Sequence, residues 1–308
     1  MVIHGLDLAA SGWVAPSSGI QGITDFEGSA GSDGQQAKAK GTLKVQKLKL
    51  VANGAPSKVP VTIRYAIDHG IQADTGTLSQ VEVAVGKATA RLSGSYQGQG
   101  PATSLKLRLN AESMPVDEIA DALPAVGVVL PSGSKLQGGM MAADLTITGP
   151  TANPVVTGPV RLSNAKLAGF DLGSKLSAIP AFSGRQTGGK DTTIQNFSTT
   201  VRMAPEGTQA NSISLTIPSF ATVTGGGTIG ASGALNFDML ADLNGGSGGG
   251  VIQKAGQGGG IPFGIEGTTS DPKFVPNVKA MAGTAARQAI SEKAGIERPD
   301  ARTGRRRR

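Results

Sequence analysis

The sequence predicts an all-β protein, dominated by antiparallel strands and carrying a few short α-helices. Apolar residues fall on alternate positions in many short runs, such as Leu105, Leu107 and Leu109 with Lys106 and Arg108 between them. A period of two is typical of a strand that is buried on one face only. Gly (46 residues) and Pro (17 residues) separate the runs, and aromatic residues make up only 4% of the chain. The composition therefore favours thin strands and many turns over a bulky globular core.

The N-terminal half is predicted to form a meander after a weakly patterned start. Residues 1–40 are rich in Gly, Ser, Gln and Asp, and we expect a poorly ordered or truncated lead-in there. The β-domain is expected over residues 41–276. Its apolar phase slips at Gln46–Lys47, which predicts a β-bulge. Strands are expected at residues 43–50, 59–65, 70–75, 78–85, 87–96 and 104–110.

Residues 144–169 are predicted to form an antiparallel hairpin whose pattern is used twice. Leu145 and Ile147 alternate before Gly149, and a second strand follows Asn153–Pro154. The spacing Ile-x-Gly-x-x-x-Asn-Pro recurs near the C-terminus with Asp in place of Asn. Gly permits a positive φ, and Asn or Asp before the rigid Pro favours a turn. The residues assigned to the two turns are Gly149, Asn153, Pro154, Gly267, Asp271 and Pro272.

Short helices interrupt the strands. Val116, Ile119 and Leu123 form one apolar stripe, which predicts an amphipathic helix over residues 114–123 that Pro124 ends. Further helices are expected at residues 172–179 and 277–296. Strands are expected at residues 192–203, 212–217, 220–224, 235–243 and 261–265, with a Gly-rich linker at 245–260 and a basic disordered tail at 297–308.

Charge and composition exclude several classes of function. The net charge is +7, but residues 297–308 supply four of these charges, so the body is nearly balanced and gives no ground for expecting nucleic-acid binding. The chain has no Cys, which removes disulfides and thiolate chemistry. No run of about 18 apolar residues is present that could span a membrane, and the N-terminus lacks a signal-peptide pattern.

No catalytic group, metal site or cofactor site is predicted. His4 and His69 lie far apart, and neither has Asp, Glu or Ser at a useful catalytic spacing. The three carboxylates within residues 117–121 fit helix capping and solubility better than acid-base chemistry. Gly225-x-Gly227-x-x-Gly230 matches the dinucleotide pattern, but strand alternation rather than a helix follows it. We therefore expect a hairpin between two strands at this motif.

The repeated apolar face is the remaining candidate for a functional surface. It can form the closed core of a β-sandwich or barrel, or it can line an open groove that holds acyl chains. Both structures need only small aliphatic side chains, so composition does not separate them. The side chains that would line the groove are Val81, Val83, Val85, Leu105, Leu107, Leu109, Leu145, Ile147, Leu215, Ile217, Phe237 and Met239.

Several segments follow one another in a distinctive order. They are Leu109–Ile119, Leu123–Gly133, Leu136-x-Gly138-Gly139, the hairpin Leu145–Gly169 and the closing run Ile261–Pro276. In this order and spacing they resemble the C-terminal region of the AsmA family, over most of the chain.

The resemblance implies a long curved antiparallel sheet that forms a hydrophobic groove, with no catalytic residues. AsmA/TamB-like proteins of Gram-negative bacteria are anchored in the inner membrane, extend into the periplasm and are thought to carry phospholipid between the two membranes. The implied partners are phospholipid acyl chains, the inner membrane through an anchor not present in this chain, and outer-membrane assembly components. The implied location is the periplasmic face of the inner membrane. The alternative is a structural β-repeat or scaffold protein that assists outer-membrane protein assembly or protein targeting to the membrane, without carrying lipid.

Overall fold

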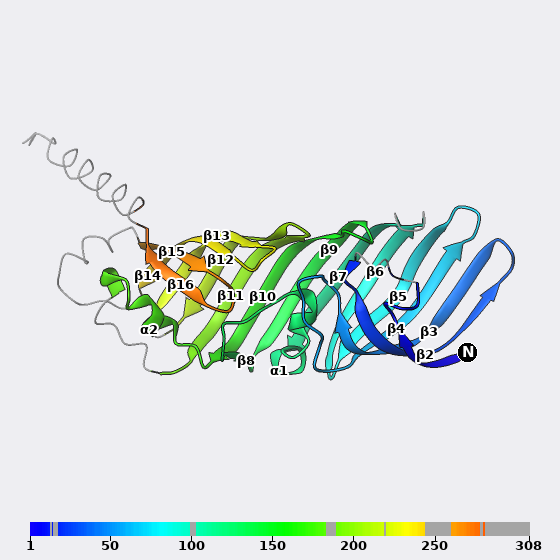
Figure 1. Cartoon of the computed structure of the whole chain (residues 1–308), viewed down its shortest axis with the longest axis horizontal. Helices are drawn as coiled ribbons and strands as arrows, with labels where there is room; N and C mark the ends of the chain where they lie inside the picture. Colours follow the sequence, from blue (N-terminus) through cyan, green and yellow to red (C-terminus); the bar gives the residue numbers. More distant parts are fainter. Residues whose placement is uncertain are drawn as a thin grey trace, which may run out of the picture.

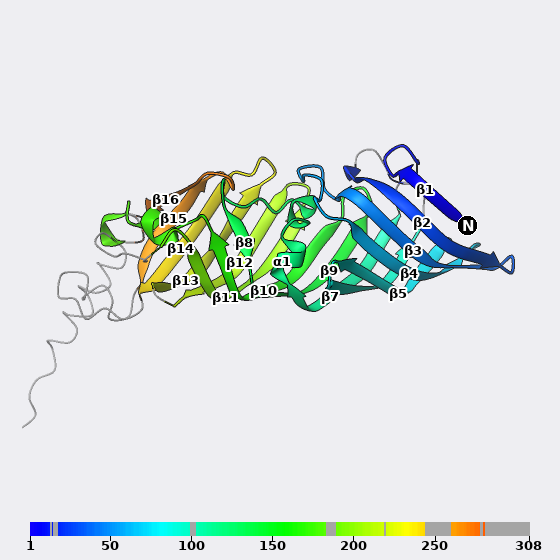
Figure 2. The same cartoon turned by 90° about the horizontal axis from the view of Figure 1, so that it is seen from below.

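A computed structural model of the chain shows one long, curved, open sheet (Figures 1 and 2). The structure describes residues 1–12, 14, 18–98, 103–182, 189–218, 220–243, 260–277 and 280. The sheet has 16 strands, and every pairing in it is antiparallel. The strands follow one another across the sheet in sequence order, except that β8 lies beside β9 on β10. The predicted fold class, all-β with a few short helices, is confirmed.

The elements have the following bounds. The first seven strands are β1 (Val2–Asp7), β2 (Gln21–Ser32), β3 (Gln36–Lys49), β4 (Val61–Gly70), β5 (Thr75–Val85), β6 (Ala88–Gln97) and β7 (Ser104–Pro115). The others are β8 (Lys135–Gln137), β9 (Met140–Pro150), β10 (Val155–Ala168), β11 (Thr192–Ala204), β12 (Gly207–Ile217), β13 (Ala221–Gly230), β14 (Leu235–Leu243), β15 (Ile261–Gly267) and β16 (Pro272–Pro276). The helical elements are α1 (Val116–Ile119), η3 (Leu123–Val126), α2 (Leu172–Leu176) and η4 (Pro180–Phe182), of which η3 and η4 are 3₁₀ helices.

The two faces of the sheet differ in polarity. Leu109 pairs with Leu92 on one side and with Leu145 on the other, so these three side chains lie on the same face. Arg108 and Asp144 alternate with them and therefore lie on the opposite face. We call these surfaces the apolar face and the polar face.

β-Bulges keep the apolar side chains on one face of the sheet where the alternation along a strand is shifted by one residue. Lys47, Asn164 and Ser212 have φ values of 52°, 53° and 54°, in the left-handed region. Such a residue inserts an extra position, so that apolar residues three apart point to the same face. The apolar pairs around these residues are Val45 and Leu48, Leu162 and Ala165, and Ala210 and Ile213. The bulge predicted at Gln46–Lys47 is confirmed.

The glycines of the apparent dinucleotide motif lie inside a strand. Gly225 and Gly227 belong to β13, and the turn to β14 follows at residues 231–234. A Cβ on Gly227 would meet the carbonyl oxygen of Asn236 at 2.3 Å and Cγ of Phe237 at 2.5 Å. Gly227 therefore gives room to the Phe237 ring on the neighbouring strand. The glycines are therefore strand residues rather than the turn that was expected.

The two long edges of the sheet carry different kinds of connection. Along one edge, which we call the hairpin edge, short turns join the strands at residues 33–35, 71–74, 151–154, 205–206, 231–234 and 268–271. Along the other, the crossing edge, the connections include the long segments 50–60, 116–139 and 169–191 as well as the short turn 86–87. Figure 1 shows α1, β8 and α2 along this second side, and Figure 2 shows α1 and β8 in front of the strands.

The buried core follows the crossing edge. Leu176, Ile179 and Phe182, from the α2–η4 segment, pack on the ends of β12 to β15. Val116 of α1 packs with Leu136 of β8 in a second cluster. These side chains are at most 8% exposed. The crossing segments thus supply the second layer that an apolar sheet face requires, and its buried side chains lie mainly along the crossing edge.

Several predicted segments differ in the structure. Residues 1–40, expected as a lead-in, contain β1, β2 and the start of β3. The prediction failed there because many of the strand residues are Gly, Ser or Ala, whose alternation is not visible as a pattern of large apolar side chains. Residues 70–75 were expected as one strand, but Gly70 ends β4, Thr75 begins β5, and residues 71–74 form the turn between them. The helix expected over 114–123 is shorter, because β7 continues to Pro115. The short helix expected at 172–179 is confirmed in α2.

Other expectations fall largely outside the described residues. These are the linker at 245–260, the helix at 277–296 and the tail at 297–308, of which the structure describes only Gly260, Asn277 and Ala280.

We predict that Phe182→Ala lowers the free energy of unfolding by about 3–5 kcal/mol. Phe182 is fully buried and meets the ring of Phe263 edge-on at a centroid distance of 5.9 Å. Urea denaturation measures the change. Leu240→Ala is the control, because Leu240 is 40% exposed and its truncation leaves little cavity. Equal small effects of both substitutions would contradict a packed α2–η4 cover.

We also predict an acid-dependent contribution from Asp144 to stability. Arg108 donates two hydrogen bonds to this carboxylate, at 2.7 and 2.6 Å, and holds its pKa below the ordinary value of 3.8. A lowered pKa stabilises the folded state above the ordinary value, and the stabilisation is lost as the pH falls through the lowered pKa. Asp144→Asn should therefore be less stable than wild type at neutral pH, and the difference should vanish in acid. Urea denaturation at several pH values measures it, with the exposed Asp242→Asn as control; a pH-independent difference would contradict the prediction.

Candidate functional site

The apolar face is continuous across nearly the whole sheet. One row of paired positions runs Tyr65, Val81, Leu92, Leu109 and Leu145 from β4 to β9. A second row continues over β10 to β16 through Gly158, Val201, Ala210, Gly227, Phe237, Ile265 and Phe274. Since each pairing is in register, the face is a single surface rather than a set of separate clusters.

The structure brings all twelve predicted groove residues onto this face. The pairings of Val83 with Ile63 and of Leu215 with Val223 join their strands to the same surface. Four of the twelve are buried: Val81, Leu107, Ile217 and Met239. The other eight are half-buried: Val83, Val85, Leu105, Leu109, Leu145, Ile147, Leu215 and Phe237.

No second sheet lies on the apolar face, because the described strands all belong to one sheet. A closed β-sandwich is therefore ruled out for this part of the chain. At the β12–β15 end, the α2–η4 segment covers Ile217 and Met239. Toward the hairpin edge, side chains such as Ile147 and Leu105 remain half-buried. The face is thus covered along the crossing edge and partly open along the hairpin edge of β7 and β9. At the turns after β13 and β15 the crossing segments reach the hairpin edge, where Asn53 Nδ2 donates to the Ala231 oxygen at 2.7 Å and Ser132 N to the Ser270 oxygen at 2.8 Å.

A hollow of about 1130 Å³ lies against strands β1 to β6. Its lining includes the charged residues Glu27, Lys40, Arg64, Glu82 and Arg91. Arg64 and Glu82 form an ion pair across β4 and β5. These charged side chains alternate along the strands with Tyr65, Val81 and Leu92, which also line the hollow, so the hollow is more polar than the rest of the apolar face.

The glycines of the two predicted turns have a positive φ, as expected. Gly149 and Gly267 have φ values of 97° and 83°. The turns are closed by backbone hydrogen bonds from Asn153 N to the Pro150 oxygen (3.0 Å) and from Asp271 N to the Thr268 oxygen (3.1 Å). Pro154 lies immediately before β10, and Pro272 is the first residue of β16. These residues direct the chain from one strand into the next.

The carboxylates near α1 also have structural partners. Asp117 Oδ1 accepts a hydrogen bond from the Gly138 amide at 3.0 Å, and Asp121 lies 3.9 Å from Lys58 Nζ. Gly138 joins β8 to β9, so Asp117 ties α1 to the crossing edge.

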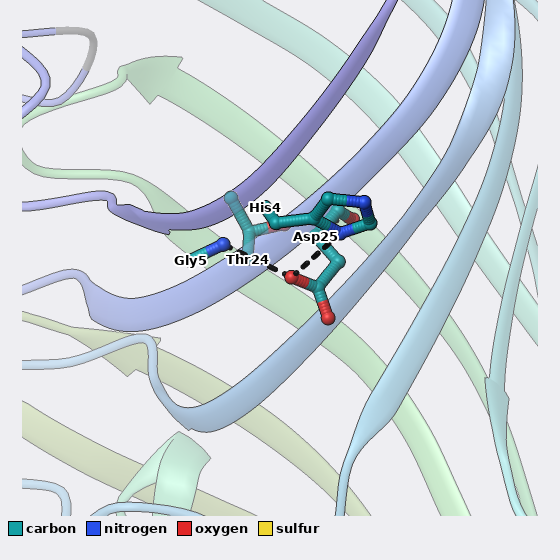
Figure 3. Close-up of polar contacts among 4 residues, drawn as sticks. All are labelled: His4, Gly5, Thr24 and Asp25. Carbon is teal, nitrogen blue, oxygen red and sulfur yellow. Dashed lines mark hydrogen bonds and ion pairs between the residues drawn. The ribbon is translucent and has the colours of Figure 1, made fainter.

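Both histidines have an acidic neighbour in space, although neither has one at a useful catalytic spacing in the sequence. His4 Nδ1 lies 3.5 Å from Asp25 Oδ1, which also accepts a hydrogen bond from the Gly5 amide at 3.0 Å (Figure 3). His69 Nε2 lies 3.7 Å from Asp74 Oδ1. The partners come from the adjacent strand for His4 and from the following turn for His69, where sequence spacing alone gives no catalytic pattern.

Tyr96 completes the second of these groups. Its hydroxyl lies 3.1 Å from His69 Nδ1, and the two rings are stacked at 5.9 Å. Burial and the nearby Asp74 raise the pKa of the Tyr96 phenol, so it keeps its proton at neutral pH. The signal that sequence analysis missed is that His69 and Tyr96 occupy apolar-phase positions of their strands, where a polar side chain is unexpected.

The described residues contain no group of three or more His, Asp or Glu side chains arranged to hold a metal ion. Within the same residues, no helix has the length and apolarity needed to cross a membrane.

Comparison with known proteins identifies no relative: no family model, curated protein or solved structure matches the chain significantly.

We predict that cysteine labelling distinguishes the two edges. The chain has no cysteine, so single substitutions report their own accessibility. Ile147→Cys, near the hairpin edge, should react with a maleimide at least several-fold faster than Ile217→Cys, whose native side chain is 3% exposed at the crossing edge. Leu240→Cys on the polar face is the positive control, since Leu240 is 40% exposed. Equal protection of Ile147→Cys and Ile217→Cys would show that the apolar face is closed along both edges.

Proposed function

We propose that this protein is a non-enzymatic carrier that holds phospholipid acyl chains on its apolar face. The observation that supports the proposal most is the continuity of that face over β2 to β16 without a second sheet against it. An ordinary sandwich would bury this surface completely.

The small aliphatic side chains suit a flexible chain better than a rigid ligand. Leu109, Leu145 and Ile147 are half-buried and lie beside one another in register with their neighbours. Each CH₂ group that leaves water against such a surface contributes about 0.8 kcal/mol. Affinity then grows with the length of chain that is covered, and no specific polar contact is needed along it.

The crossing segments would give this surface one protected side. Backbone hydrogen bonds join Leu50 N to the Ala125 oxygen and Ala55 N to the Pro124 oxygen, both at 2.9 Å, so the 50–60 segment and η3 support each other. A chain lying on the face would have fixed cover along that side and would enter from the hairpin edge.

The cellular role rests on the resemblance to the AsmA family. On that basis we place the protein at the periplasmic face of the inner membrane, where it would pass phospholipid toward the outer membrane and support outer-membrane assembly. Transfer along the sheet would require only translation over a uniform apolar surface, without a catalytic step.

We predict that phospholipid co-purifies with the natively isolated chain and that Leu109→Arg reduces its amount several-fold. Leu109 is central to the apolar face, and a guanidinium there would have to be desolvated against the acyl chain. Mass spectrometry of the intact complex and of its lipid extract measures the bound lipid.

Asn110→Arg is the matched control, because Asn110 is the next residue on the same strand and lies on the polar face. It should leave the lipid content unchanged. Absence of phospholipid from the wild-type chain would count against lipid carriage and favour the scaffold alternative.

A further inference from the structure

Three polar residues lie together at the hairpin edge of the apolar face. His69 is the last but one residue of β4, Asp74 ends the following turn, and Tyr96 lies near the end of β6. His69 and Tyr96 both pair with Gly76 of β5, one from each side. A Cβ on Gly76 would lie 2.1 Å from Cζ of Tyr96, so the ring crosses over this glycine to reach the imidazole. The absence of a side chain at Gly76 is what brings the two rings together.

The surroundings of this cluster change from polar to apolar over one step. The outermost row at the edge runs Ser32, Ala37, His69, Gly76 and Tyr96, and continues through Leu105 to Gly149. The next row inward contains Ala30, Ala39, Ile67, Leu78, Gly94, Leu107 and Ile147. Such a sequence of rows matches an amphiphile whose polar group lies at the edge and whose chains lie further in.

The cluster offers one donor and one acceptor to a ligand. When the Tyr96 hydroxyl donates to Nδ1, the proton of the imidazole is on Nε2. Nε2 lies 3.7 Å from Asp74 Oδ1, which is too long for a hydrogen bond, so both atoms have capacity left for a ligand. The His69 and Asp74 side chains are 29% and 55% exposed, so a ligand can reach them.

We propose that His69, Asp74 and Tyr96 form a headgroup site for a lipid with a phosphodiester and a primary ammonium group, as in phosphatidylethanolamine; this rests on the proposed function. His69 Nε2 donates to a phosphate oxygen, and Asp74 accepts from the ammonium group. Tyr96 is a positioning residue, because it fixes the tautomer and the orientation of the imidazole.

Asp74 determines which headgroups the site accepts. A carboxylate beside the phosphate repels a purely anionic headgroup, such as phosphatidylglycerol, but attracts an ammonium on the same ligand. The described strands place the titratable side chains Tyr65, His69 and Tyr96 on the apolar face, with no Lys or Arg at a paired position of that face to compensate Asp74. The site therefore favours a zwitterion over an anion.

The test compares dioleoyl phosphatidylethanolamine and dioleoyl phosphatidylglycerol, which share their acyl chains, in binding to the purified full chain. We expect wild type to prefer the ethanolamine lipid, and Asp74→Asn or His69→Phe to reduce that preference about tenfold, as the loss of one charge-assisted hydrogen bond would. Tyr96→Phe should reduce it less. Binding of phosphatidylglycerol should strengthen in Asp74→Asn, because the repelling carboxylate is removed, and should change little in His69→Phe and Tyr96→Phe, because that lipid does not use the site in wild type.

His4→Phe is the matched control. His4 is the only other histidine in the chain, also lies beside a carboxylate, and is on the polar face with its side chain 79% exposed (Figure 3). It should leave the preference unchanged. Because there are two histidines, imidazole NMR signals can be assigned with this variant, and added ethanolamine lipid in short-chain form should shift the His69 signal and not the His4 signal.

The outcomes separate this inference from the proposed function. Binding of both lipids with equal affinity, or variants that keep the wild-type preference, overturns the headgroup site and leaves acyl-chain binding intact. Failure of wild type to bind either lipid overturns both. Glycerophosphoethanolamine, which has the headgroup without acyl chains, distinguishes a lipid from a free headgroup as the ligand. If it shifts the His69 signal with the same affinity as the short-chain ethanolamine lipid, the polar site is supported but its ligand is a free headgroup.

Discussion

The structure depends on one constraint: a single sheet with one apolar face has no second sheet to cover it. An apolar face must be buried against another layer, and most β-proteins use a second sheet for this. Here the crossing segments take that role, with Val116 of α1 and Phe182 of η4 both fully buried against strand ends. These segments all leave the sheet at one edge, and at the C-terminal end two of them reach the other edge. Asn53 Nδ2 donates a hydrogen bond to the Ala231 oxygen at 2.7 Å, and Ser132 N donates one to the Ser270 oxygen at 2.8 Å.

Continuity of the apolar face depends on local backbone conformation as much as on the choice of side chain. A strand of fourteen residues such as β10 drifts out of phase with its neighbours unless its twist is adjusted. Asn164, with its positive φ, lies opposite Gly138–Gly139, and there Leu162 and Ala165 both keep to the apolar side. Gly227 has a related role, since it lets the Phe237 ring lie flat across the neighbouring strand. The high glycine content is thus a requirement of close strand packing across a long curved sheet.

Alternation alone predicted most of the strands and the face to which each groove residue belongs. It succeeded from β3 onwards because side-chain period and register are linked, so that Val81, Leu109 and Leu145 could be placed together before their pairings were known. It failed in β2, where the strand residues are small. It also failed at residues 71–74, which form a turn although they contain few residue types typical of turns. The Asp74–His69–Tyr96 cluster could not be found from spacing, because Tyr96 lies 27 residues from His69 and reaches it only across Gly76. A useful signal was present all the same: a histidine and a tyrosine in the apolar phase of their strands.

The presence of His69 and Tyr96 on the apolar face also supports a binding role for this face over that of an incompletely buried core. A structural sheet gains nothing from placing His69 and Tyr96 on its apolar side, since a buried polar group without partners destabilises a fold and an aliphatic residue would pack as well. The cluster is satisfied internally by the Tyr96–His69 contact, yet it stays accessible through His69 and Asp74. Its position at the open edge, one row outside an aliphatic surface, is what an amphiphilic ligand requires and what a closed core does not. The same geometry would orient any bound lipid with its chains toward the crossing edge, where the α1 and α2–η4 segments limit how far they extend.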